Sequence, residues 1–171
     1  TYWKGRLYFG SRDGSVYCVR ADDGALIWRY RAVPDRRLFA LEQLESVWPI
    51  PGSVLVENNL VSFAAGRSMY LDGGLRFFRL DAVSGRKTVE VIYDDKDPET
   101  GADLQTRVKT LQMPVGLNDV LSSDGKWTYL RSQKIGPDGK RVEIGPVSGS
   151  AVEQGAAQKG EGAHLFAPMG F

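Results

Sequence analysis

The feature that most constrains the fold is a succession of short apolar runs separated by glycine turns. Arg6–Gly10 and Ser15–Val19 flank the turn Asp13-Gly14, and Asp22-Asp23-Gly24 then leads into Ala25–Tyr30. Turns of the Asp-Gly type between runs rich in aromatic and β-branched residues are typical of antiparallel strands. This first segment is therefore predicted to form three strands in a meander.

The same layout returns twice further along the chain. Strands are expected at 53–56, 60–65, 75–80 and 87–92, and again at 119–122, 127–131 and 141–144. In the first two units an alanine, Ala21 or Ala82, precedes the turn glycine, Gly24 or Gly85. A four-stranded unit of this kind takes about 40–45 residues, and the larger spacing fits a long connection between the units. The repeat predicts one kind of four-stranded sheet used several times.

These strands carry apolar residues on both faces, as in Val16–Val19 and Phe77-Phe78. A sheet with one face in water would alternate between apolar and polar residues more regularly. Two buried faces fit a blade held between its neighbours in a β-propeller, whereas an ordinary β-sandwich is the alternative. The predicted fold class is all-β, with about three four-stranded antiparallel blades of an incomplete propeller.

The expected organisation follows from the strand pattern. The segments are a partial blade 1 (1–30), a long connection (31–52), blade 2 (53–92), a second long connection (93–118), a partial blade 3 (119–144), and a flexible loop with the start of another strand (145–171). In the first connection, Leu38, Leu41, Leu44 and Val47 have helical spacing, which fits either a short helix or a loop anchored by leucines and Trp48. Propellers typically have about 4–8 blades. We therefore expect either a piece of a larger propeller or closure by association with other copies.

Two stretches resemble the repeat of pyrroloquinoline-quinone (PQQ) propellers. Gly10–Tyr17 and Ala21–Trp28 have the pattern of a strand, an alanine, a turn glycine and a tryptophan that closes the blade, although Val89 stands in the tryptophan position of the second unit. Trp28 is expected to pack its ring over the next blade. The resemblance implies a periplasmic, envelope-associated or secreted bacterial protein. Because many proteins with this repeat bind no quinone, it implies either a scaffold or a dehydrogenase.

Composition excludes several classes of function. Lys plus Arg is 22 and Asp plus Glu is 21, so a net charge of +1 gives no reason to expect nucleic acid or an anionic membrane as partner. Insertion into a membrane is not expected either, because the sequence lacks an apolar run of about 18 residues. Cys18 is the only cysteine and His164 the only histidine, so an internal disulfide and a cysteine-rich metal site are excluded.

No catalytic residues, metal or cofactor are predicted, and the role expected is a non-catalytic binding or scaffolding surface. The alternative is a fragment of a quinone-dependent oxidoreductase that uses PQQ with calcium. The vicinal disulfide that often lies beside the quinone cannot form here, and no G-x-S-x-G nucleophile motif is present. The acidic turn Asp94–Asp103 does not have the spacing of an EF-hand and is interpreted as a solvated loop.

The predicted binding surface lies on the long connections. In a propeller blade, the segments 31–52, 66–73 and 93–118 fall on the same side, and long loops in compact folds tend to carry function. The candidate residues there are Arg36, Arg37, Glu42, Glu45, Trp48, Arg67, Tyr70 and Asp72. They suit a protein partner or an anionic ligand. The alternative is that Arg36 and Arg37 pair with Glu42 and Glu45 only to hold the loop.

Overall fold

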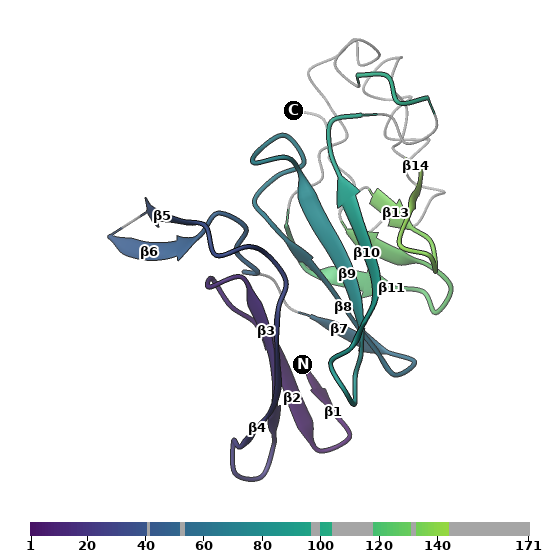
Figure 1. The fold of residues 1–171 in the computed structure, drawn as a ribbon. Helices are drawn as coiled ribbons and strands as arrows, with labels where there is room; N and C mark the ends of the chain where they lie inside the picture. Colours follow the sequence, from purple (N-terminus) through teal and green to yellow (C-terminus); the bar gives the residue numbers. More distant parts are fainter. Residues whose placement is uncertain (41, 52–53, 97–99, 104–117, 131–132, 144–171) are drawn as a thin grey trace, which may run out of the picture.

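A computed structural model describes residues 1–40, 42–51, 54–96, 100–103, 118–130 and 133–143, and these ranges form three four-stranded antiparallel sheets and a hairpin (Figure 1). Blade 1 contains β1 (Tyr2–Trp3), β2 (Arg6–Gly10), β3 (Ser15–Arg20) and β4 (Leu26–Arg31). Blade 2 contains β7 (Leu55–Glu57), β8 (Leu60–Ala65), β9 (Leu75–Asp81) and β10 (Lys87–Tyr93). Blade 3 contains β11 (Leu121–Ser123), β12 (Thr128–Leu130), β13 (Gln133–Ile135) and β14 (Arg141–Glu143). The predicted all-β class is confirmed.

Two strands were not expected from the sequence. β1 adds a fourth strand to blade 1, and β13 adds a fourth strand to blade 3 just before the predicted Pro137-Asp138-Gly139 turn. β1 has two residues and β13 has three, so neither is long enough to show an alternating pattern. They are recognised only by their pairing with β2 and β12.

The first long connection contains a hairpin rather than a helix, made by β5 (Arg37–Ala40) and β6 (Gln43–Ser46). The helical interpretation of this segment is therefore wrong. Glu42 has a φ of 62°, a left-handed conformation that reverses the chain and is incompatible with a continuing right-handed helix. No helix long and apolar enough to cross a membrane occurs in the described ranges.

The blades pack face to face through two apolar layers. Phe78 lies between blades 1 and 2 and stacks on Phe63, with 5.2 Å between ring centroids. The adjacent Phe77 points to the opposite face, where it stacks on Tyr93 and packs toward blade 3. Consecutive residues of a strand point to opposite faces. Blade 2 is thus buried on both faces, as its apolar sequence predicts.

Blade 1 docks onto blade 2 through Trp28. Its indole Nε1 donates a hydrogen bond to the carbonyl oxygen of Ala82 at 3.2 Å, and the Tyr8 hydroxyl donates to the same oxygen at 3.0 Å. The ring lies against Gly85, where an added Cβ would be 2.7 Å from Cδ2 of the indole. The expectation that Trp28 packs over the neighbouring blade is confirmed. The glycine is required at this turn both by its φ of 70° and by the closeness of the ring.

Blade 2 docks onto blade 3 with different side chains at the same place. Val89 packs against Gly139, where an added Cβ would lie 2.5 Å from Cγ1 of the valine. The side chain of valine has no hydrogen-bond donor, and the carbonyl oxygen of Pro137 instead accepts a hydrogen bond from Arg79, which is paired across the sheet with Val89. The two interfaces therefore share a docking geometry but differ in polarity.

Replacing Gly85 by alanine should destabilise the chain far more than the same change at Gly24. Both glycines have φ near +70°, but nothing lies within 4 Å of an added Cβ at Gly24. Gly24→Ala should cost about 1–2 kcal/mol from the backbone conformation alone. Gly85→Ala should cost about 1–3 kcal/mol more because its methyl group meets the indole. Urea unfolding of both variants gives the difference.

A Trp28→Ala background provides the control for this comparison. Without the indole, Gly85→Ala should cost no more than Gly24→Ala. Equal effects of the two glycine substitutions in the wild-type background would contradict the docking contact.

Candidate functional site

The described residues of the β4–β7 and β8–β9 connections lie on one side of the sheets, the upper side in Figure 1, where the outer strand β10 also ends. This side is called the long-loop side below. The opposite side is called the short-turn side, and it carries the β3–β4, β7–β8, β9–β10, β11–β12 and β13–β14 turns. Arg67 in the β8–β9 connection forms an ion pair with Glu45 of β6, with 2.8 Å between Nη2 and Oε1. The indole of Trp48 donates a hydrogen bond to the backbone carbonyl of Asp72 at 3.0 Å. Glu45, Trp48, Arg67 and Asp72 are therefore brought together.

Two residues that the sequence did not single out complete this arrangement. The guanidinium of Arg76 lies over the Trp48 ring, 5.5 Å from its centroid. The Asn118 amide donates to the carbonyl oxygens of Ala64 at 2.8 Å and Gly66 at 3.0 Å, so it ties the β10–β11 connection to β8. Neither residue lies in a motif, and only the three-dimensional fold identifies them.

Tyr70 lies in the β8–β9 connection, which also carries Arg67 and Asp72. Its ring packs against buried Met69 in the β8–β9 connection. Burial, followed by the nearby charge of Asp95, raises the pKa of its hydroxyl. Tyr70 is thus positioned as a packed side chain of the loop.

The alternative in which Arg36 and Arg37 pair with Glu42 and Glu45 is not what the described residues of the hairpin show. The hairpin register places Arg37 opposite Ser46, so Arg37 and Glu45 project to opposite faces. Arg37 pairs instead with Asp35 at 2.8 Å, and Arg31 pairs with the same carboxylate at 3.3 Å. These arginines hold the pKa of Asp35 below its usual range. Exposed Arg36 lies at the base of the hairpin and exposed Glu42 lies at its turn.

The hairpin itself presents an apolar pair to solvent. Phe39 and Leu44 are directly opposite each other in the register and are 74% and 61% exposed. Below them, half-buried Leu38 and buried Val47 pack against the core shared by blades 1 and 2. Figure 1 shows the hairpin extending away from the sheets. An exposed cross-strand pair on an anchored hairpin is a candidate contact surface.

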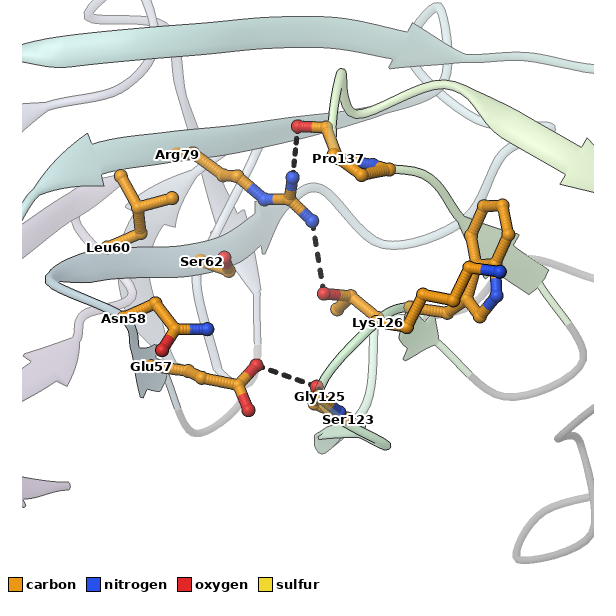
Figure 2. Close-up of a pocket in the computed structure, with 11 residues that line it drawn as sticks. Glu57, Asn58, Leu60, Ser62, Arg79, Ser123, Gly125, Lys126 and Pro137 are labelled. Atoms are coloured by element: carbon orange, nitrogen blue, oxygen red, sulfur yellow. Dashed lines mark hydrogen bonds between the residues drawn. The ribbon is translucent and has the colours of Figure 1, made fainter.

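A pocket lies on the opposite, short-turn side, between blades 2 and 3 (Figure 2). Its volume is about 180 Å³, and it is bordered by the β7–β8 turn of blade 2 and the β11–β12 turn of blade 3. Its lining residues include Glu57, Asn58, Ser62, Arg79, Lys126 and Thr128. Sequence patterns did not indicate this pocket, because its lining residues are far apart in the chain and lie next to short turns.

Arg79 is the charged centre of this pocket. The residue is 7% exposed, and its guanidinium donates hydrogen bonds to the carbonyl of Pro137 and, at 3.1 Å, to the hydroxyl of Thr128. Burial lowers the pKa of Arg79 from its ordinary value. An arginine side chain nevertheless stays protonated in proteins. The pocket wall thus carries a positive charge at physiological pH.

The β11–β12 turn beside the pocket is ordered by Asp124. Its carboxylate accepts hydrogen bonds from the backbone N–H groups of Lys126 and Trp127 and from the hydroxyl of Tyr129. These donors lower the pKa of Asp124 to about 2, the backbone bond from Trp127 having the largest effect. The turn that carries Lys126 and Trp127 is therefore stabilised by an ionised aspartate.

The described ranges contain no group of three histidine, cysteine or acidic side chains arranged to hold a metal ion. Cys18 is buried against blade 2, and burial raises the pKa of its thiol. His164 lies outside the described residues, as does the middle of the acidic turn Asp94–Asp103. Lys96 and Asp103 of that turn form a backbone bridge.

Comparison with known proteins identifies the fold. No family model and no curated protein matches the sequence. The chain is similar to the crystal structure of quinohemoprotein alcohol dehydrogenase from Comamonas testosteroni, with 17% identity, a TM-score of 0.58, and coverage of 84% of this chain and 26% of that one. It is also similar to quinohemoprotein alcohol dehydrogenase ADHIIG from Pseudomonas putida HK5, with 18% identity, a TM-score of 0.52, and coverage of 76% and 20%.

BamB from Moraxella catarrhalis matches with 17% identity and a TM-score of 0.46, over 88% of this chain and 38% of that one. The chain therefore spans well under half the length of each of these proteins. The two dehydrogenase structures show the fold, which is a part of a PQQ-like β-propeller. The resemblance to the PQQ propeller repeat, which the sequence indicated, is confirmed.

Stability should fall in acid as Asp124 takes up a proton. Its pKa of about 2 in the folded chain lies below the ordinary value near 3.9. The contribution of ionised Asp124 to the free energy of unfolding is therefore fully present above about pH 4 and is lost as the pH falls toward 2. Thermal melting between pH 2 and 5 should show a smaller acid loss for Asp124→Asn than for the wild type. An equal loss in both would show that other carboxyl groups dominate.

Proposed function

We propose that the chain is a segment of a non-catalytic propeller that provides a binding or scaffolding surface within a larger bacterial envelope or secreted protein. The observation that supports this most directly is the exposed pair Phe39 and Leu44 on the β5–β6 hairpin. Large apolar side chains at the centre of an interface contribute most of its binding energy. On this proposal, the hairpin is the part of the chain that enters a partner.

The base of the hairpin is held in a way that suits such a role. Glu45 is bound to Arg67, and the next buried residues, Val47 and Trp48, are anchored in the core and on the β8–β9 connection. Because the backbone is already ordered, a partner would not have to pay the full entropy of fixing it. This arrangement favours binding by a preformed surface.

The charges of the long-loop side favour a protein over a small anion as the ligand. Arg67 is paired with Glu45, and Arg31 and Arg37 share the carboxylate of Asp35. Guanidinium donors already bonded to a carboxylate are less available to a small anion. A protein segment with apolar side chains is therefore the partner that we propose for Phe39 and Leu44.

We also propose that a further blade covers the outer face of blade 1. Leu7, Phe9 and Leu26 are 39%, 45% and 60% exposed there. The Gly24 turn is open where the corresponding Gly85 turn receives Trp28. A sheet with a docking aromatic residue on its outer strand fits this turn.

The covering blade would come either from another copy of this chain or from the rest of the parent protein. Light scattering distinguishes the two, because another copy of the chain would give a concentration-dependent dimer and a remaining blade of the parent would not.

A random-peptide display library tests the hairpin without assuming a partner. Peptides selected on the wild-type chain should bind the Phe39→Ser/Leu44→Ser variant at least about tenfold more weakly, because the apolar contact is lost. Val83→Ser is a matched control, since Val83 is 50% exposed in the β9–β10 turn on the other side. The control should leave affinity unchanged. Failure to select peptides that discriminate the two variants would contradict the proposal.

The alternative function is a fragment of a quinone-dependent oxidoreductase, supported by the similarity of fold to two quinohemoprotein alcohol dehydrogenases. Adding PQQ with calcium and recording the absorbance spectrum separates the two functions. The binding-module proposal predicts no saturable change in the quinone spectrum with this chain or with its full-length parent. Stoichiometric bound quinone in the parent would support the oxidoreductase instead.

A further inference from the structure

We propose that the pocket between blades 2 and 3 binds a small monocarboxylate that also carries a hydroxyl or amino group, with Arg79 as the carboxylate-binding residue. The pocket is on the short-turn side, whereas the proposed partner surface is on the long-loop side. Binding of a ligand in this pocket therefore does not depend on the proposed protein-binding role of the hairpin.

The pocket exists because one row of side chains changes between the two blades. In blade 1, Tyr8, Cys18 and Trp28 are paired across β2, β3 and β4, and this row fills the interface with blade 2. The corresponding row of blade 2 is Ser62, Arg79 and Val89 across β8, β9 and β10. The two large aromatic residues at the ends of the row are thus replaced by serine and valine, whereas the central Cys18 corresponds to the larger Arg79, which extends to the carbonyl of Pro137. The smaller side chains leave a space of about 180 Å³ at this end of the interface.

The hydrogen-bond partners of the Arg79 guanidinium in the described part of the protein are neutral, although the charges of Asp138 and Glu57 also act on it. It donates to the Pro137 carbonyl and the Thr128 hydroxyl, and the ion pairs found in the described ranges do not include it. A guanidinium has five N–H donors, and a buried charge is normally paired with an opposite one. The remaining N–H donors suit a carboxylate, whose geometry matches a guanidinium.

Ser62 provides a second and independent observation. It is directly paired with Arg79 across the sheet, so both side chains lie on the face that lines the pocket (Figure 2). The residue is 5% exposed, and its hydroxyl makes no hydrogen bond within the described residues. A buried hydroxyl without a partner is costly, and most buried polar groups are satisfied. A carboxylate bound to Arg79 would accept the hydrogen bond that Ser62 can donate.

Glu57 and Lys126 define the class of ligand further. Glu57 lies on another wall of the pocket, where its carboxylate accepts a hydrogen bond from Ser123 at 2.7 Å. This negative charge disfavours a dianion such as a phosphate monoester, but its second oxygen can accept a hydrogen bond from a hydroxyl or amino group. Lys126 at the rim adds a positive charge that attracts the anion. The lining charges favour a ligand with one carboxylate and one donor.

Glycolate is the simplest probe with both groups, and acetate and inorganic phosphate are its comparisons. We expect saturable binding of glycolate to the full chain by titration calorimetry, with a shift of the Arg79 Nε–H signal in ¹H–¹⁵N NMR spectra. Acetate should bind more weakly because it lacks the donor for Glu57. Phosphate should bind more weakly because Glu57 repels its second charge. Phosphate binding as tight as glycolate, or no saturable signal with glycolate, would overturn the proposal.

Variants of the lining residues test the assignment without removing Arg79, whose loss endangers the blade interface. Ser62→Ala should lower glycolate affinity about 3- to 10-fold, the effect of one hydrogen bond, without reducing the stability of the unbound chain. Lys126→Met should also weaken binding. Lys140→Met is its matched control, because Lys140 lies in the β13–β14 turn on the same side but does not line the pocket.

The Lys140→Met control distinguishes binding in the pocket from a general attraction of anions to positive charge on this side of the protein. Lys140→Met should leave the affinity unchanged. Equal effects of Lys126→Met and Lys140→Met, or unchanged affinity in Ser62→Ala, would overturn the assignment of the pocket.

Discussion

The structure depends on one contact, in which a side chain of the outer strand of a blade lies on the turn of the next blade. A blade is a sheet with apolar residues on both faces, so it is stable only when each face is covered. Trp28 covers blade 2 by packing on Gly85 and by donating to the Ala82 carbonyl. The glycine permits the approach of the ring, and the indole N–H satisfies a carbonyl that the ring would otherwise shield from water.

Variation within this contact explains why the two blade interfaces differ. When tryptophan is replaced by Val89, the hydrogen bond to the next blade is lost from the outer strand and is supplied by Arg79 on the neighbouring strand. An arginine reaches the carbonyl but brings a charge close to the apolar cluster, with its guanidinium 5.5 Å from the centroid of the Phe77 ring. The interface therefore combines an apolar cluster with polar side chains, and the pocket lies among the polar ones.

Local patterns predicted much of the fold and little of the site. The turn glycines, the docking role of Trp28 and the two buried faces of blade 2 follow from short segments of sequence. The hairpin did not, because the leucine spacing imitates a helix and the reversal depends on the left-handed Glu42. The ion pair between Glu45 and Arg67, and the pocket around Arg79, join residues from different elements. Their contacts depend on strand register and blade packing, which a single sequence does not specify.

Because the pocket lies between blades 2 and 3, a ligand bound there would also affect how these two blades associate. Its walls come from two blades, with Ser62 and Arg79 on one side and Thr128 and Lys126 on the other. A ligand that needs both walls binds only when the blades are docked, so by mass action it stabilises their association. The blade 1 interface has no such dependence, because Tyr8 and Trp28 fill the corresponding position. We therefore expect a small anion to stabilise the interface between blades 2 and 3 more than the interface between blades 1 and 2.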